Sequence, residues 1–113
     1  MDETVKRASL DELPLERLFD GKVLRRVFQA RNLEIVEYVY KRGAHFPEHR
    51  HPEEQVTIIE SGEITFSIDG EEIELKKGDI CHIPPNKPHS AKVLKSREVR
   101  TLNVFHPPRK TRP

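Results

Sequence analysis

The chain has 113 residues, with 20 Lys and Arg against 19 Asp and Glu, which gives a formal net charge of +1. This length predicts one domain with a single modest core, and charges of both signs mixed along the chain argue against a nucleic-acid-binding face or a membrane-surface patch. No apolar run is long enough to span a bilayer. The polar, acidic start predicts no signal peptide. A lone cysteine, Cys81, excludes an internal disulfide and indicates a reducing, cytoplasmic setting.

The first 21 residues are expected to form an N-terminal arm with no more than one helical turn. Ser9 is a candidate N-cap with Glu12 three residues later, and Pro14 ends the turn. The arm also carries an apolar set, and a barrel of this size leaves sheet edges to cover. We therefore predict a homodimer with the N-terminal third at or near the interface. The apolar set is Leu10, Leu13, Leu15 and Leu18.

Residues 22–106 alternate short apolar segments with turn residues. Apolar and polar positions alternate in 63–68 and again in 71–75, and the Asp69-Gly70 pair between them predicts a tight hairpin. The Ser61-Gly62 pair gives a second tight connection, to a strand at 56–60. Further strands are expected at 32–42, 79–83, 90–94 and 98–105. This spacing predicts an all-β sandwich or barrel, and residues 107–113 are expected to form a loose tail.

Histidines and one glutamine form the candidate chemistry. His49 and His51 are two apart, so on a strand they share a face, and a turn at Pro52 would bring Gln55 back to the same point. His89, remote in sequence, would close the site. Neutral imidazole suits Zn, Fe, Ni, Cu or Mn, and an amide oxygen is a weaker neutral donor. We predict one divalent transition-metal ion at this point; the alternatives for the fourth ligand are Glu53 and Glu54.

Other residues have more ordinary interpretations. His45 is expected to be an exposed strand residue or a support for the ligands, whereas His82 and Cys81 are expected to pack within a strand. Tyr38 and Tyr40 share a strand face, where they would either line a pocket or belong to the core or a dimer interface. The low number of Asn and Gln beside so many charged residues indicates a heat-adapted source.

Two motifs resemble those of the cupins. Residues 43–62, GAHFPEHRHPEEQVTIIESG, match G-x5-H-x-H-x3-E-x6-G with Gln55 in place of glutamate. Residues 78–93, GDICHIPPNKPHSAKV, match G-x5-P-x-G-x2-H-x3-N with Asn86 and Val93 as departures. The resemblance covers about residues 22–106 and implies a double-stranded β-helix, the jelly-roll barrel of a small single-domain cupin. It implies function only loosely, because this fold carries many activities.

The last predicted strand sharpens the resemblance. Alternation places Thr101, Asn103 and Phe105 on one face, and with the ending VFHPPR the chain resembles the pectin-degradation cupins, which linearise unsaturated uronates. That resemblance implies Phe105 in the pocket and Arg109 on the substrate carboxylate. The acid–base aspartate of those proteins falls on Asn103, an amide that cannot shuttle a proton. The metal ligands that it implies are His49, His51, Gln55 and His89.

The ligand set decides between activities. With glutamine in place of a carboxylate the site keeps a charge of +2, which favours Lewis-acid chemistry over high-valent iron. We predict an isomerase or ring-opening enzyme for a small anionic, uronate-like sugar acid, with Asn103 and Arg109 in the catalytic set and Phe105, Tyr38 and Tyr40 binding the substrate. An Fe(II)-dependent dioxygenase and a non-catalytic sugar-binding module are the alternatives, so whether the chain is an enzyme stays open.

Overall fold

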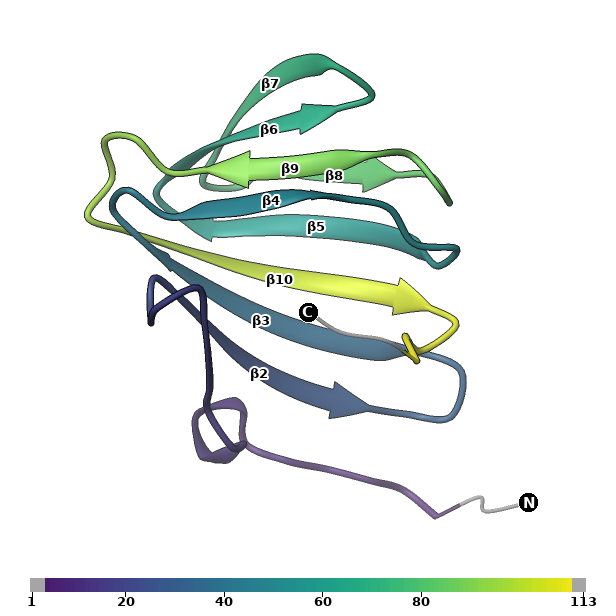
Figure 1. Cartoon of the computed structure of the whole chain (residues 1–113). Helices are drawn as coiled ribbons and strands as arrows, with labels where there is room; N and C mark the ends of the chain where they lie inside the picture. The colour runs from purple at the N-terminus through teal and green to yellow at the C-terminus, as the bar shows by residue number, and fades with distance from the viewer. Residues whose placement is uncertain (1–3, 111–113) are drawn as a thin grey trace.

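The fold consists of two antiparallel sheets facing each other. A computed structural model describes residues 4–110. The larger sheet has the order β1-β2-β3-β10-β5-β8 and the smaller β4-β9-β6-β7; in Figure 1, β7, β6, β9 and β4 lie above β10, β3 and β2. This confirms the predicted all-β jelly-roll barrel. The strands are β1 (Glu16–Leu18), β2 (Val23–Gln29), β3 (Glu34–Lys41), β4 (His45–His49), β5 (Glu54–Ser61), β6 (Glu63–Ile68), β7 (Glu71–Lys76), β8 (Ile80–Ile83), β9 (His89–Lys92) and β10 (Glu98–His106).

The hairpin predicted around residues 69 and 70 is present. Strands β6 and β7 pair with Ile64 opposite Leu75, and the connecting residues Asp69 and Gly70 have φ angles of 52° and 82°. A two-residue type I′ turn requires positive φ at both central positions, which Asp-Gly tolerates. The turn fixes the register, so both apolar residues face the core together.

The core lies between the two sheets. Val36 and Ile59 from the larger sheet and Ile64 and Phe66 from the smaller one are each at most 3% exposed. Fully burying a side chain of this size stabilises the fold by about 1.5–3 kcal/mol. On β10, alternate residues from Val99 are buried while those between are partly exposed, as the period-2 pattern predicts. One face of this strand therefore points into the barrel, where the candidate site lies.

The connection between β5 and β6 depends on a glycine. Gly62 has a φ of +81°, and a Cβ added there would lie 2.6 Å from the carbonyl oxygen of Glu98 and 2.9 Å from a methyl group of Val99. Only glycine allows this close approach of two backbones. The register of β10 against β5 shifts between Arg100 and Thr101, next to this contact. The tight Ser61-Gly62 connection predicted from the sequence thus also sets how β10 lies along β5.

The N-terminal arm differs in part from its prediction. The helical turn is present as a 3₁₀ helix, η1 (Leu10–Glu12), in which the carbonyl of Ser9 accepts from the N–H of Glu12 at 2.9 Å. Within the described residues the Ser9 side chain makes no cap hydrogen bond, so that half of the capping prediction is wrong. Residues 16–18 form a strand that was not predicted, β1, which pairs with β2.

Strand β1 exists because of its neighbour. Its sequence, ERL, carries no strand pattern of its own, but Glu16 receives hydrogen bonds from Arg25 at 3.0 and 3.3 Å. Nearby, the side chain of Arg26 donates to the carbonyl of Leu13 at 3.3 Å. These contacts fasten the arm along β2. Residues 1–3 of the arm and 111–113 of the predicted tail lie outside the described residues. In the part of the chain that is described, no helix has the length and apolar character needed to cross a membrane.

Candidate metal centre

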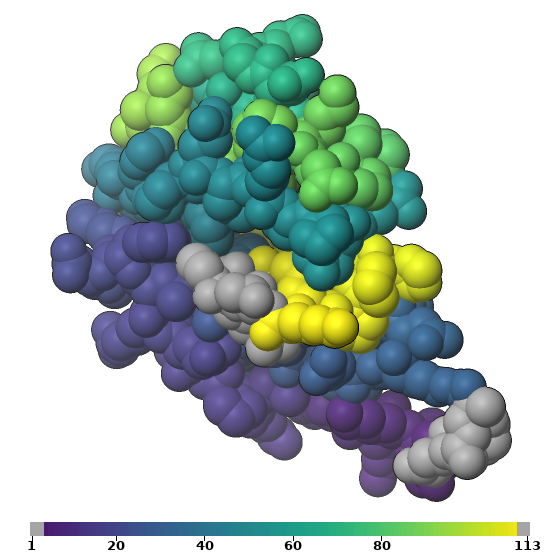
Figure 2. Space-filling view, turned by 45° about the vertical axis from the view of Figure 1, so that its right-hand side comes forward, coloured from purple at the N-terminus to yellow at the C-terminus, as the bar shows by residue number. Residues whose placement is uncertain are grey.

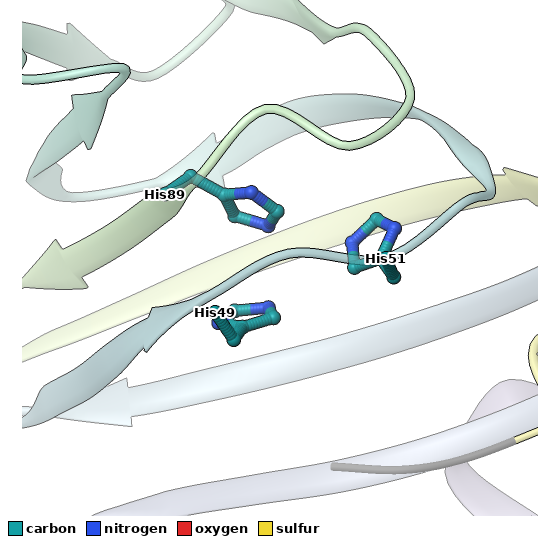
Figure 3. A group of neighbouring side chains, drawn as sticks. All are labelled: His49, His51 and His89. Atoms are coloured by element: carbon teal, nitrogen blue, oxygen red, sulfur yellow. The ribbon is translucent and has the colours of Figure 1, made fainter.

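Three histidine rings meet at one point inside the barrel. His49 ends β4, His51 follows two residues later, and His89 begins β9 directly opposite His49 in the sheet. One potential ligand nitrogen from each ring lies within 4.8 Å of the other two, and Figure 3 shows the rings turned toward one another. The centroids of His49 and His89 are 4.3 Å apart. The spacing of these histidines in the sequence thus predicts a cluster that the structure contains.

Backbone bonds hold the two histidine segments together. The N–H of Asn86 donates to the carbonyl of His51 at 2.8 Å. Asn86 has a φ of 63°, in the left-handed region that asparagine tolerates better than most residues, which explains how it replaces the glycine of the motif. At the other end, the N–H groups of Gly43 and Val93 bond to the carbonyls of Val93 and Ala44 at 2.8 and 3.0 Å.

Each ring is fixed by a main-chain carbonyl. The Nδ1 atoms of His49, His51 and His89 lie 2.9, 3.0 and 2.8 Å from the carbonyl oxygens of residues 47, 53 and 87. A carbonyl oxygen only accepts hydrogen bonds, so each Nδ1 carries the proton. In the neutral ring Nε2 then keeps its lone pair. This is how metal-binding histidines are oriented in proteins.

Gln55 presents an acceptor to this cluster. Its Oε1 lies 3.1 Å from Nε2 of His51. Because Nδ1 of His51 already donates to a carbonyl, two lone pairs face each other unless a positive centre lies between or beside them. A proton on the ring or a metal ion would supply that charge. Three imidazole nitrogens and an amide oxygen are a donor set suited to Zn, Ni, Cu or Fe, so the residues fit the ion that the sequence predicts.

Burial favours the form of histidine that binds metals. It lowers the pKa of His49 from its ordinary value and that of His89 to about 4, although the carbonyls beside their Nδ1 atoms act in the opposite direction. The cause is the loss of water around the charged imidazolium. A neutral imidazole is the ligand form, so this environment keeps the lone pairs available.

The two glutamates considered as alternatives to Gln55 have other contacts. The carboxylate of Glu54 bonds to His82 at 2.7 Å on the outside of the barrel. A carboxylate oxygen of Glu53 lies 3.7 Å from Nδ1 of His51, the nitrogen directed away from the cluster. The His82 side chain is 52% exposed, so the prediction that it packs within the strand is wrong: β8 is an edge strand and His82 lies on its outer face. His45 is exposed.

A buried polar cluster backs Gln55. Its Nε2 donates to Thr57 Oγ1 at 2.9 Å and to Asn103 Oδ1 at 3.2 Å. The Thr57 hydroxyl donates to the same Asn103 oxygen at 2.6 Å. Asn103 is 1% exposed and is not among the described residues that line the neighbouring cavity. It faces inward as strand alternation predicts, but it lies behind Gln55 rather than in the cavity.

The cavity beside the histidines is narrow and carries one arginine. Its volume is about 20 Å³, room for roughly one water molecule. Arg109, 4% exposed, contributes to its wall. The other residues that line the cavity are Tyr38, Tyr40, Phe46, His49, Gln55, Phe66, His89, Ser90, Ala91 and Phe105. Figure 2 shows the yellow end of the chain between the green and teal strands above and the blue strands below.

Arg109 is held by partners that include Glu34, Tyr38 and Phe105. Its Nε donates to Glu34 Oε1 at 3.2 Å and its Nη2 to the hydroxyl of Tyr38 at 3.1 Å, and its Cζ lies 4.0 Å from the centroid of the Phe105 ring. Burial raises the pKa of the neighbouring Tyr40 hydroxyl, which therefore keeps its proton. The cavity is thus lined by a fixed guanidinium, two phenols and three of the four candidate metal ligands, His49, Gln55 and His89.

The residues that were missed in the sequence include two that hold predicted site residues in place. Glu34, 0% exposed, holds Arg109, and Thr57 holds Asn103. Glu34 is two residues before Val36 on the inward face of β3, so the same alternation that marks Tyr38 and Tyr40 would have found it. Thr57 is likewise two residues after Gln55 on β5.

Comparisons with known proteins agree with this geometry. The structure resembles that of KdgF from a Halomonas species, with a TM-score of 0.86, 22% identity, and coverage of 95% of this chain and 97% of that one. An uncharacterized protein of Methanocaldococcus jannaschii is 26% identical over 95 residues, 79% of this chain and 76% of its own length. An acireductone dioxygenase of Bacillus thuringiensis is 32% identical over 63 residues, but this match spans 51% of the chain and 37% of the dioxygenase. The cupin domain model matches residues 36–105, and the chain therefore belongs to the cupin domain family.

Proposed function

We propose that the chain is a Lewis-acid isomerase or ring-opening enzyme that acts on a small, uronate-like sugar acid. The observation that carries the proposal is that one cavity is lined both by the ligand set, represented by His49, His89 and Gln55, and by the guanidinium of Arg109. A neutral ligand set leaves the full charge of a divalent ion in place, and a buried guanidinium is suited to a carboxylate. The structural likeness to KdgF supports the fold of such an enzyme.

The site residues would have different roles in this reaction. A divalent ion held by the three histidines and Gln55 would polarise a hydroxyl or carbonyl oxygen of the sugar. Arg109 would bind the carboxylate, exchanging part of its contact with Glu34 for the substrate. Proton transfer falls to groups other than Asn103, because an amide cannot accept a proton at neutral pH. Tyr38 lines the cavity and is the candidate for accepting and returning the proton. Tyr40, whose hydroxyl keeps its proton, would act only as a proton donor.

The substrate requires the cavity to open. A volume of about 20 Å³ admits a water molecule but not a six-carbon sugar acid. The segment after β10 that carries Arg109 is the wall that can move without unpairing a strand, because β10 ends at His106. Opening of this segment would admit the sugar, and its return would bring the guanidinium onto the carboxylate.

The test is metal analysis followed by an assay on an unsaturated uronate. The protein should copurify with one divalent transition-metal ion, turn over the uronate, and lose turnover in His49→Ala. Arg109→Lys should raise KM more than it lowers kcat, because the fork of the guanidinium is lost. Binding of the uronate without turnover would assign the barrel to sugar binding alone. Absence of both binding and turnover would refute the sugar-acid proposal.

An Fe(II)-dependent dioxygenase is the second candidate, and the partial match to acireductone dioxygenases favours it. Its ligand set would be the same. Consumption of O₂ that requires both Fe(II) and an organic substrate, with no isomerisation of uronates, would decide for this activity over the first.

We also propose that the protein is a cytoplasmic homodimer. The arm presents apolar surface, with Leu15 43% exposed and Val5 88% exposed, and the edge strand β8 adds Ile80 at 68%. Exposed apolar side chains on an edge strand and on an arm are surfaces that proteins commonly cover by association. A monomeric mass in light scattering at micromolar concentration would refute the dimer.

A further inference from the structure

We infer that Asn103 is a positioning residue that decides which end of the Gln55 side-chain amide faces the metal centre, and that the backbone carbonyl of Val36 sets the direction of Asn103. This rests on the metal-binding part of the proposed function and not on the identity of the substrate. It gives Asn103 a role other than the acid–base role that the resemblance suggests for its position.

A main-chain atom sets the orientation of the Asn103 side-chain amide. The Nδ2 of Asn103 lies 3.1 Å from the carbonyl oxygen of Val36 and 3.0 Å from Thr101 Oγ1. The carbonyl can only accept, so it requires the nitrogen end of the Asn103 amide. The Thr101 hydroxyl donates to the carbonyl of Tyr38 at 3.4 Å, which leaves its oxygen to accept from Asn103. Both contacts therefore select the same orientation, and Oδ1 points the other way.

The orientation of the Asn103 amide in turn fixes that of the Gln55 amide. Its Oδ1 accepts from Gln55 Nε2 at 3.2 Å and from the Thr57 hydroxyl at 2.6 Å. A reversed Gln55 would place its own oxygen against Asn103 Oδ1, with no proton between the two. Gln55, Thr57 and Asn103 are at most 6% exposed, so water does not relieve such a contact, and unmatched buried polar atoms are costly.

The side-chain amides of Asn103 and Gln55 thus point in the same direction, each with its nitrogen toward an acceptor and its oxygen toward the metal centre. Val36 carbonyl orients Asn103, Asn103 orients Gln55, and Gln55 turns Oε1 toward Nε2 of His51 at 3.1 Å. A metal ion needs the oxygen of a glutamine, since its amide nitrogen has no available lone pair. This explains why an asparagine suits this position: it needs a donor on one side and an acceptor on the other. An ionised aspartate would set an oxygen against the Val36 carbonyl.

The affinity for Zn²⁺ tests the inference through a double-mutant cycle. Asn103→Leu keeps the size of the side chain and removes both polar ends, so it should weaken Zn²⁺ binding by about 10- to 100-fold in chelator competition. Gln55→Leu removes the ligand itself. If Asn103 acts through Gln55, the double variant should bind no more weakly than Gln55→Leu alone. If instead the affinity losses of the two single variants multiply in the double variant, Asn103 has an independent, structural role, and the inference is overturned.

Thr57→Val is the matched control within the same buried cluster. The Thr57 hydroxyl both donates to Asn103 and accepts from Gln55. Because its proton can rotate from one partner to the other, it constrains the direction of Gln55 less than the Asn103 oxygen does, and its loss should leave Zn²⁺ affinity within a few-fold of wild type. The Co²⁺ absorption spectrum should change in Asn103→Leu and not in Thr57→Val, because only the first frees the oxygen ligand to turn away. A loss in Thr57→Val equal to that in Asn103→Leu would trace the effect to packing and overturn the inference.

Nuclear magnetic resonance gives a test in which the buried amide cluster keeps all of its residues. The chain has two glutamines, Gln29 and Gln55, so Gln29→Ala assigns the Gln55 amide signals. Without metal, its Nε2 protons should show Overhauser effects to Thr57. Addition of Zn²⁺ should shift the Gln55 Cδ carbon while both Nε2 protons persist. Protons that instead approach the His51 ring would overturn the inference.

The same measurements separate this inference from the proposed function. A wild-type protein that binds no Zn²⁺, Ni²⁺ or Fe²⁺ refutes the metal enzyme, and the metal-free Overhauser pattern still decides the amide direction. Tight Zn²⁺ binding that Asn103→Leu leaves unchanged overturns the inference and leaves the enzyme proposal standing.

Discussion

Arg109 lies over the ring of Phe105, with its Cζ 4.0 Å from the ring centroid. The same ring meets the His51 ring edge to face, with centroids 5.6 Å apart and planes at 72°. Phe105 thus contacts both the buried cation and one of the metal-binding histidines. Its position on the inward face of β10 fixes where the guanidinium stands relative to the metal centre.

Phe105→Leu should weaken binding of a uronate more than it weakens binding of metal. The substitution removes a cation–π contact worth about 0.5–2 kcal/mol, which corresponds to roughly a 2- to 30-fold loss of affinity. Calorimetric titration with the uronate and with Zn²⁺ measures both. Phe28→Leu is the control. The Phe28 ring also makes a cation–π contact, with Lys6 Nζ 5.3 Å from the ring centroid, but this contact lies outside the candidate site. Equal effects of the two variants on uronate binding would contradict the role given to Phe105.

Glu34→Gln should lower stability and strengthen anion binding. The carboxylate is 0% exposed and its partner Arg109 is 4% exposed, and removing one member of a buried pair costs about 3–5 kcal/mol. A glutamine keeps part of the hydrogen bonding, so we expect a loss toward the lower end of that range. The Glu34 carboxylate then no longer competes with the ligand for the Arg109 guanidinium. Thermal unfolding and uronate titration give the two results.

Glu98→Gln is the control for Glu34→Gln. The pair of Lys41 and Glu98 is shorter, at 2.7 Å, than the 3.2 Å pair of Arg109 and Glu34, but its side chains are 43% and 39% exposed. Exposed pairs contribute about 0–1 kcal/mol because water and salt screen them. A larger loss in Glu98→Gln than in Glu34→Gln would show that distance, and not burial, governs these pairs.

Gly62→Ala should destabilise the fold more than Gly70→Ala. Both positions have a φ near +81°, which costs roughly 1–2 kcal/mol for an L-residue. A Cβ at residue 62 would also lie 2.6 Å from the Glu98 carbonyl, whereas nothing in the described chain lies within 4 Å of one at residue 70. The difference between the two free energies of unfolding, from denaturant titration, isolates this clash. Equal losses would mean that β10 shifts without cost.

His89→Ala should abolish tight Zn²⁺ binding, whereas His82→Ala should not. His89 is 5% exposed and belongs to the cluster, whereas the His82 side chain is 52% exposed and pairs with Glu54. Removing Zn²⁺ with a chelator should lower the melting temperature of wild type and of His82→Ala. Zn²⁺ at 100 times its Kd adds about 2.7 kcal/mol to stability. A chelator effect of the same size in His89→Ala would place the metal elsewhere.

The parts of the site that could be predicted are those that follow from the spacing of residues within a short segment of the sequence. His49 and His51 are two residues apart on an extended segment, and the turn to Gln55 follows directly, so strand geometry and a proline were sufficient. The pair of Glu34 and Arg109 joins residues 75 apart, and no local pattern links them. Asn103 takes its direction from a main-chain oxygen of Val36, which the residue types do not encode. Strand β1 required the side chain of Arg25 on a neighbouring strand.

The three carbonyls that hold the histidine rings belong to Pro47, Glu53 and Lys87. A carbonyl is present whatever side chain a residue carries, so substitutions at these three positions leave the anchors in place as long as the loops keep their path. The walls of the cavity, by contrast, consist of side chains. In a barrel built this way, wall side chains can be exchanged while the three histidine rings stay aligned, which makes the chain a suitable scaffold for the design of new binding specificities.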